Sequence, residues 1–181
     1  MERALIRSAV PEDAERLLEI YAYYVLNTAV TYEDTVPALP DFRSSMEKVL
    51  ERYPFLVLCA EGRVQGYACA RAFYEHAAFA HCCQLTIYLD PSSVRHGYGR
   101  QLYEALETSL RDMGITNLYA CIGVPAQEPD AYLTRNSEQF HAHLGFRRIG
   151  TFHRFGRKFG HAYHMIWMEK ILEQDPMPGV F

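Results

Sequence analysis

The chain has 181 residues, of which 49% are hydrophobic and 22% are charged, a composition that fits a globular protein and excludes intrinsic disorder. The formal charge of −4 disfavours a general nucleic-acid-binding protein, and no apolar run approaches the ~20 residues needed to span a membrane. The five cysteines form no CxxC pair and the N-terminus lacks the apolar core of a signal peptide, so we expect reduced thiols in a cytoplasmic protein.

The first half of the chain alternates short apolar runs, which predict strands, with segments whose apolar residues recur at helical spacing. Ala4–Arg7 is predicted to be the first strand. Pro11 suits the first turn of a helix, where a backbone N–H has no helical partner, and apolar residues recur at helical spacing from there to Val25. The other elements of this half are a helix and two strands, predicted over Asp41–Arg52, Phe55–Ala60 and Val64–Ala72.

The second half begins with a predicted strand, Gln84–Leu89, and a helix that Gly97 and Gly99 open and Gly114 ends. We expect this helix to bury one apolar stripe, made of Leu102, Tyr103, Leu106, Leu110 and Met113. The remaining predicted elements are Leu118–Ile122, the helix Ser137–Leu144, and the strands Phe146–Phe155 and Tyr163–Met168. This alternation predicts one mixed α/β (α+β) domain over residues 1–172, followed by a C-terminal tail over residues 173–181.

The most informative motif is a strand, a loop and a glycine pair before a helix, Q-L-T-I-Y-L-D-P-S-S-V-R-H-G-Y-G-R. Glycines there let backbone N–H groups converge on a phosphate, because a Cβ would obstruct the approach or strain the backbone. The helix N-terminus adds partial positive charge, and Arg95 and Arg100 add full charges. Neither a dinucleotide fingerprint nor a P-loop is present, since position 102 is Leu and no Gly-Lys-Ser/Thr follows. Taken alone, the motif also fits an ordinary helix start.

Further blocks, in order and spacing, carry a family resemblance from Leu5 to Lys170. They are Ile6–Ala9 (IRSA), Ile20–Tyr21 (IY), Val25–Glu33 (VLNTAVTYE), Gly66–Ala68 (GYA), Ile87–Leu89 (IYL), His96–Arg100 (HGYGR), Ser137–Phe146 (SEQFHAHLGF) and Gly156–Gly160 (GRKFG). With these blocks the chain resembles the GCN5-related N-acetyltransferase (GNAT) superfamily and, within it, the phosphinothricin and methionine-sulfoximine acetyltransferases. The final block is the most specific to that subfamily.

The resemblance implies a GNAT fold, a mixed and mostly antiparallel sheet splayed at the fourth strand and flanked by about four helices. Acetyl-CoA would enter the splay as cosubstrate, with no metal. The implied cofactor contacts are the backbone of Ile87, Tyr88 and Leu89 along the pantetheine, and the loop Arg95, His96, Gly97, Tyr98, Gly99 and Arg100 around the diphosphate. Arg95 stands at a position where the family commonly has glycine. Asn136 is a candidate partner of the pantetheine, or alternatively a helix N-cap.

The implied reaction is direct attack of an amine on the acetyl thioester, which requires removal of a proton from the amine. The subfamily's glutamate base aligns with Gln84, and a neutral amide is no base at neutral pH. Three alternatives stay open: a relocated base, proton loss through water or arrival of a neutral amine, and a CoA-binding domain with weak catalysis. The candidates for a relocated base are Glu75, His76, His81 and His164. We favour retained activity, because positioning alone can accelerate transfer.

His141 stands where the superfamily often has a tyrosine that protonates the departing thiolate and where this subfamily commonly has histidine. Two interpretations are equally compatible with the sequence: an acid or cofactor-holding residue, and a histidine packed beside Phe140 and Leu144 on the short helix.

The acceptor pocket is expected to differ from a phosphinothricin site. Tyr74 aligns with an arginine that can clamp a substrate carboxylate in the subfamily, so that contact is lost. Candidates for the pocket walls are Tyr32, Glu33, Tyr74, His76, Lys158 and Phe159. Core packing is the alternative role for Tyr32 and Phe159, and a solvated or structural cation is the alternative for Lys158. No metal site is expected, because adjacent residues such as His81 and Cys82 point to opposite faces of a strand.

The sequence therefore predicts an acetyl-CoA-dependent N-acetyltransferase that acts on the primary amine of a small molecule, an amino acid or an analogue. No nucleic acid or membrane partner is expected, and the resemblance implies a homodimer. Two alternatives remain: a CoA-binding module with weak or no catalysis, suggested by Gln84, and acetylation of peptide or protein N-termini.

Overall fold

The computed structural model describes residues 4–172, so the predicted tail over 173–181 lies outside the described residues. Within that range the strands are β1 Leu5–Ser8, β2 Phe55–Ala60, β3 Arg63–Ala72, β4 Cys82–Leu89, β5 Asn117–Pro125, β6 Arg147–Lys158 and β7 His161–Ile171. The helices are α1 Ala14–Asn27, α2 Leu39–Leu50, α3 Tyr98–Asp112 and α4 Asn136–His143. Each predicted strand and helix is confirmed.

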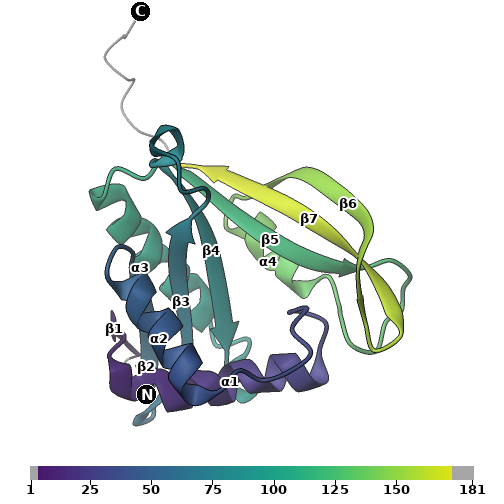
Figure 1. Ribbon diagram of the computed structural model, residues 1–181, viewed down its shortest axis with the longest axis horizontal. Helices are drawn as coiled ribbons and strands as arrows, with labels where there is room; N and C mark the ends of the chain where they lie inside the picture. The colour runs from purple at the N-terminus through teal and green to yellow at the C-terminus, as the bar shows by residue number, and fades with distance from the viewer. Residues whose placement is uncertain (1–3, 173–181) are drawn as a thin grey trace, which may run out of the picture.

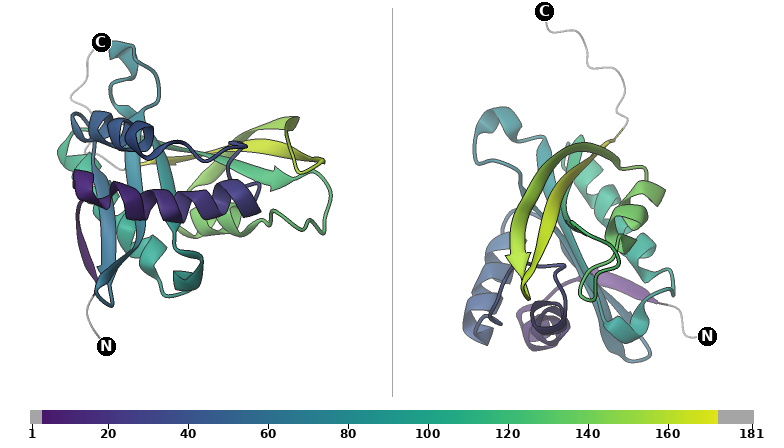
Figure 2. Two further views of the ribbon diagram at one scale, coloured as in Figure 1. Left: turned by 60° about the horizontal axis from the view of Figure 1, so that its bottom comes forward. Right: turned by 90° about the vertical axis from the view of Figure 1, so that its right-hand side faces the viewer.

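The seven described strands form one sheet in the order β1-β2-β3-β4-β5-β7-β6. Neighbouring strands are antiparallel except β4 and β5, which are parallel. Figure 2 shows α1 and α2 on one side of the sheet and α3 and α4 on the other. Alternate residues of the strands therefore enter two separate apolar cores, one beneath α1 and α2 and one beneath α3.

The sheet opens between β4 and β5, as the resemblance implies. Their pairing covers only Cys82 to Gln84 on β4 and Asn117 to Tyr119 on β5. Beyond Gln84 the two strands diverge, and β5 continues outward with β7 and β6 (Figure 1). Residues 85–89 of β4 consequently have a strand partner on the β3 side alone within the described chain.

Differences from the predicted elements lie at their ends. β4 begins at Cys82, so Gln84 is its third residue, and β6 and β7 are both longer than predicted. The predicted buried stripe of α3 is confirmed for its first four members, whereas the prediction for Met113 is wrong. Met113 caps the helix and is 47% exposed, because Gly114, with a φ of +78°, turns the chain away from the helix axis.

Candidate active site

The gap between β4 and β5 contains a cavity of about 230 Å³, which we call the splay cavity. β4 forms one wall and β5 the other, and parts of the α1–α2 loop, α3 and α4 complete the lining. Its lining residues are residues 30–32, 84–88 and 120–123 together with Tyr103, Leu133, Ser137 and His141. The cavity begins where β4–β5 pairing stops, so an extended ligand can lie beside β4 in the place of a strand.

A second cavity, of about 370 Å³, lies on the side of the sheet covered by α1 and α2, and we call it the helix-side cavity. Its lining residues are Tyr21, Glu33, Phe42, Ser45, Met46, Val49, Phe55, Tyr67, Cys69, Arg71, Gln84, Thr86 and Tyr88. Gln84, Thr86 and Tyr88 line both cavities, since alternate residues of β4 share a face. Ligands in the two cavities would therefore meet at this stretch of β4.

The loop before α3 leaves backbone groups open to solvent at the helix start. Gly97 is the N-cap residue of α3 with a φ of +77°, and no atom lies within 4 Å of a Cβ built on it. Arg95 has a φ of +69°, in agreement with its alignment to a common glycine position. The side chains of Arg95, His96 and Arg100 are exposed, so two guanidinium groups lie in the segment that opens α3, next to its positive end.

Asp90 anchors this loop to the rest of the fold. Its carboxylate accepts a hydrogen bond from the Ser92 backbone N–H at 2.8 Å and pairs with the guanidinium groups of Arg16 and Arg63. Burial opposes ionisation, but the hydrogen bonds from Ser92 and Arg16 outweigh it and hold the pKa of Asp90 well below its ordinary value. The turn that leads into the glycine pair is thus fixed by a carboxylate that stays ionised at neutral pH.

His141 is buried and lines the splay cavity. Its Nδ1 lies 2.7 Å from the Ser137 carbonyl oxygen and its Nε2 lies 2.7 Å from the Tyr103 hydroxyl. Burial lowers the pKa of His141 to about 4, so the ring is neutral at pH 7. Because a carbonyl only accepts, Nδ1 carries the proton and Nε2 accepts from Tyr103. His141 therefore packs as one interpretation expects and also faces the cavity as the other expects, while its acid role stays a prediction.

Tyr32 and Glu33, both predicted for the acceptor site, line different cavities. Tyr32 lines the splay cavity and packs over Gly156, where a Cβ would sit 2.3 Å from the ring, and its hydroxyl lies 3.4 Å from the His164 carbonyl oxygen. Tyr32 also packs against a small apolar cluster, as the core-packing interpretation expects, while its role at the acceptor stays a prediction. Glu33 lines the helix-side cavity.

Lys158, a candidate for the acceptor wall, does not line either cavity. Its side chain is 5% exposed, and its ammonium donates to the carbonyl oxygens of Val25 at 2.8 Å and Thr31 at 2.9 Å. Lys158 thus joins the end of α1 to the segment that reaches the splay cavity. It is a structural cation rather than a solvated one.

Three further candidates for the acceptor wall also lie outside both cavities, and they are Tyr74, His76 and Phe159. Tyr74 is 59% exposed and follows the end of β3, where its ring contacts Phe73 and Phe79. Phe159 stacks on Tyr132 in the turn between β6 and β7. The alignment of Tyr74 with the subfamily's arginine could not show that β3 ends at Ala72, before that position.

The residues considered for a relocated base do not line either cavity. Glu75 pairs with Arg52 at the surface, and the His164 imidazole accepts a hydrogen bond from the Arg154 backbone N–H. His76 and His81 are exposed on the β3–β4 connection. None of these four groups therefore lies beside Gln84 in a cavity, and the path of the amine proton stays a prediction.

Two expectations about individual side chains change with the structure. Asn136 is the first residue of α4, and the N-cap is Arg135, so the N-cap interpretation of Asn136 is wrong. The Leu89 carbonyl oxygen accepts a hydrogen bond from the Tyr24 hydroxyl at 2.6 Å, which engages one of the backbone groups predicted to face the cofactor.

Arg71 is the site residue that the sequence did not indicate. It lies on β3 directly opposite Gln84 and lines the helix-side cavity. Its sequence neighbours are alanines, so no motif marks it. Pairing of β3 with β4, which fixes its position, follows only from the folded register.

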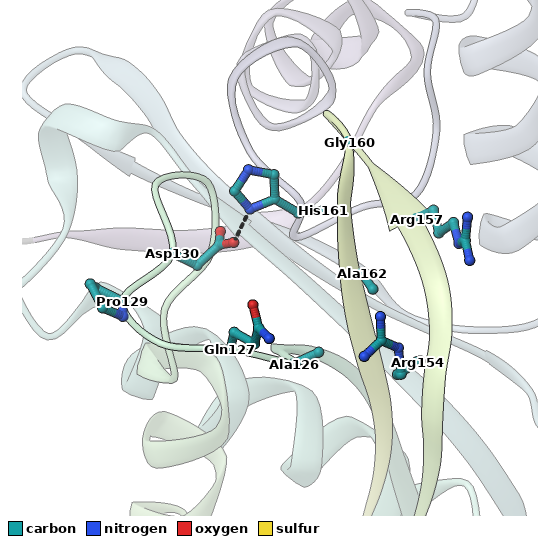
Figure 3. A pocket seen from close by; sticks show the side chains of 9 residues that line it. All are labelled: Ala126, Gln127, Pro129, Asp130, Arg154, Arg157, Gly160, His161 and Ala162. Atoms are coloured by element: carbon teal, nitrogen blue, oxygen red, sulfur yellow. Dashed lines mark hydrogen bonds and ion pairs between the residues drawn. The ribbon is translucent and has the colours of Figure 1, made fainter.

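A third cavity, of about 410 Å³, lies away from β4, between the segment after β5 and the β6–β7 hairpin (Figure 3). Asp130 and His161 face each other there, with the carboxylate 2.6 Å from Nδ1. The same carboxylate group also accepts from the backbone N–H groups of Tyr132 and Leu133. Asp130 thus orders this loop, and none of the predicted site residues lines the cavity.

Among residues 4–172, no three His, Cys, Asp or Glu side chains are grouped so as to hold a metal ion. The five cysteines all carry free thiols. No helix within those residues is long and apolar enough to cross a membrane.

Residues 6–167 match the family described as the acetyltransferase (GNAT) domain. The chain belongs to the GNAT acetyltransferase family. It is 30% identical to a phosphinothricin N-acetyltransferase of Streptomyces coelicolor, over 92% of this chain and 95% of the relative. It is also 30% identical to the L-amino acid N-acyltransferase MnaT of Escherichia coli, over 96% of both chains.

Solved structures agree with this GNAT assignment. A phosphinothricin acetyltransferase from Sinorhizobium meliloti in complex with AcCoA superposes with a TM-score of 0.85 at 30% identity, covering 98% of this chain and 95% of that one. An acetyltransferase from Salmonella typhimurium with its cofactor acetyl-CoA gives 0.84 at 27% identity, covering 99% of both. The protein is an N-acetyltransferase of the GNAT fold, and its cosubstrate is acetyl-CoA. In this chain the splay cavity lies beside the unpaired end of β4, and Gly97 has open space around it at the start of α3.

Proposed function

We propose that this GNAT enzyme transfers the acetyl group of acetyl-CoA to the primary amine of a small molecule, an amino acid or an amino acid analogue. The observation that carries the proposal is the shared wall of the two cavities, where Gln84, Thr86 and Tyr88 border both. A thioester in the splay cavity and an amine in the helix-side cavity would meet there. The names of the relatives, phosphinothricin N-acetyltransferase and L-amino acid N-acyltransferase, support the same class of acceptor.

The cosubstrate is proposed to lie along β4 with its diphosphate at the start of α3. Backbone groups of Ile87, Tyr88 and Leu89 would pair with the pantetheine, since β4 has no β5 partner there. The residues proposed around the diphosphate are Arg95, His96, Gly97, Tyr98, Gly99 and Arg100. Asn136, exposed at the first turn of α4, is proposed near the pantetheine.

The reaction forms a C–N bond between the amine and the acetyl carbonyl carbon and breaks the C–S bond, so the coenzyme leaves as a thiolate. Gln84 is proposed to orient the amine or a water by hydrogen bonding, and the proton of the amine passes to water in the solvent-open helix-side cavity. The neutral His141 is proposed to hold the sulfur end of the cofactor together with Tyr103. A backbone N–H near Tyr88 is the proposed donor to the oxyanion.

A homodimer in the cytoplasm is proposed as the working form. Within residues 4–172 the edge strands of the sheet are β1 and β6, and on β6 the side chains of Ile149, Phe152 and Phe155 are between 48% and 62% exposed. Apolar side chains on an edge strand favour association with a second chain. Light scattering during size-exclusion chromatography tests this proposal, and a monomer at micromolar concentration would contradict it.

The experiment that tests the proposed activity measures free thiol release from acetyl-CoA with three kinds of acceptor: free amino acids, simple amines and short peptides. Turnover of free amino acids supports the proposal. Turnover of peptides alone would support N-terminal acetylation. Binding of CoA without turnover of any acceptor would support a non-catalytic CoA-binding module, for which the presence of Gln84 is the supporting observation.

A further inference from the structure

The helix-side cavity is lined by one cation and one anion, Arg71 and Glu33, among otherwise uncharged residues. Neither side chain forms an ion pair within residues 4–172. Two opposite charges that line one cavity without pairing to each other leave both available to a ligand that carries the complementary pair. The remainder of the lining includes an apolar group from α2: Phe42, Met46 and Val49.

Arg71 and Glu33 reach the cavity from different elements. Arg71 lies opposite Gln84 in the β3–β4 register, so the two side chains share the face that borders the cavity. Glu33 comes from the α1–α2 loop, next to Thr31 and Tyr32 of the splay cavity. An acceptor held by both charges would therefore lie beside Gln84, at the wall that the two cavities share.

Tyr21 lines the same cavity as the two charges. Its hydroxyl bonds to the Thr31 hydroxyl at 3.1 Å, and its ring packs against Tyr88 with centroids 5.1 Å apart. Burial chiefly raises the pKa of Tyr21, the Glu33 carboxylate raises it further, and the Arg71 guanidinium lowers it. Both charges thus act on one fixed phenol, which places them around a common space.

We propose that Arg71 and Glu33 bind the two ends of a zwitterionic α-amino acid, with Arg71 on its carboxylate and Glu33 on its ammonium. This rests on the proposed function and names its acceptor more closely. The apolar residues of α2 would contact the side chain of the acceptor, which points to an amino acid with an uncharged, apolar side chain. Carboxylate recognition is accordingly on β3 at Arg71 and not at Tyr74, which lies outside the cavity.

The test compares L-leucine, L-leucinamide and L-glutamate as acceptors for the wild type, Arg71→Gln and Glu33→Gln. The wild type is expected to prefer leucine. Arg71→Gln should lower kcat/KM for leucine by roughly 10- to 100-fold, mainly through KM, and leave leucinamide within about threefold, because only leucine carries the carboxylate. Glu33→Gln should raise KM for leucine and leucinamide alike. Arg52→Gln, at a surface ion pair outside both cavities, is the matched control and should change neither.

An unchanged leucine-to-leucinamide ratio in Arg71→Gln would overturn the proposal. Calorimetric titration of L-leucine into the CoA-bound protein distinguishes a wrong amino acid site from a wrong proposed function. If no acceptor is turned over but leucine binds and Arg71→Gln abolishes the binding, the amino acid site stands and the transfer activity does not. If leucine does not bind to the wild type, the proposed site is wrong whatever the activity.

Discussion

The Tyr103 hydroxyl and the Nε2 atom of His141 lie 2.7 Å apart, and both residues line the splay cavity. Tyr103 comes from α3 and His141 from α4, so the contact joins the helix that follows the proposed diphosphate loop to the helix that borders β5. With Nδ1 bonded to Ser137, both ring nitrogens have partners, and the neutral ring is the form that the structure favours.

The depressed pKa of His141 predicts a loss of stability in acid. The ordinary pKa is 6.5 and the folded value is about 4, so between these values the unfolded chain binds more protons than the folded one. The contribution of the neutral His141 ring to the free energy of unfolding is therefore fully present above pH 6.5 and is lost as the pH falls from there towards 4. Urea unfolding at pH 7.0 and 4.5 should show His141→Gln losing roughly 2 kcal/mol less than the wild type over this interval. Equal losses in both proteins would contradict the assignment.

Introduction of a carboxylate at position 84 should raise the rate. Gln84 borders both cavities, so a glutamate there can take the proton from an amine that attacks across this wall. Gln84→Glu is predicted to increase kcat/KM at least about tenfold at pH 8, measured by thiol release. Gln84→Ala is the control and should lower it. A fall in rate in Gln84→Glu would mean that the amide has a role of its own.

Substitution of Gly97 tests the loop before α3. A residue with a Cβ at a φ of +77° is strained by roughly 1–2 kcal/mol even though space is open. Gly114, at the other end of α3, has a φ of +78° and equally open surroundings, so Gly114→Ala is a matched control. Both variants should lose similar stability in urea. Only Gly97→Ala should also weaken CoA binding in calorimetry, by about tenfold. Equal affinities of the two variants for CoA would mean that the loop before α3 does not bind the cofactor.

Removal of the Lys158 ammonium should destabilise the fold. Lys158→Met leaves the carbonyl oxygens of Val25 and Thr31 without their donor in a buried position. The predicted cost is about 2 kcal/mol in the free energy of unfolding, measured by urea denaturation at pH 7. Lys48→Met, at an exposed position on α2, should change it by less than about 0.5 kcal/mol. If Lys158→Met loses activity without losing stability, Lys158 acts at the acceptor site and not in the fold.

The elements and their order could be predicted from the sequence because local patterns determine them. Pro11 marks the start of the first helical segment and Gly114 the end of α3, since the backbone conformations that these residues favour are fixed locally. The extent of the β4–β5 pairing could not be predicted in the same way. It depends on contacts between residues that lie 35 positions apart in the chain, such as Cys82 and Asn117, and nothing in residues 84–89 alone indicates where β5 diverges.

The candidate site was predictable where a motif carries it and not where side chains meet across strands. The glycine loop was indicated by its spacing before a helix and Gln84 by the family resemblance, whereas the position of Arg71 follows only from the register of β3 and β4. Tyr74 illustrates the converse, because an alignment position gives no information on where a strand ends. The role of Lys158 was ambiguous because a lysine in a predicted strand is expected to be exposed. Only the folded structure shows that its ammonium donates to the carbonyl oxygens of Val25 and Thr31 in a buried position.

The most direct test of the central claim is a crystal structure of the protein with acetyl-CoA. The pantetheine is predicted to lie between β4 and β5 beyond Gln84, with the diphosphate against the backbone N–H groups that follow Arg95 and the thioester beside the wall shared by the two cavities. Electron density for the cofactor anywhere else, with the gap between β4 and β5 closed by side chains, would contradict the account.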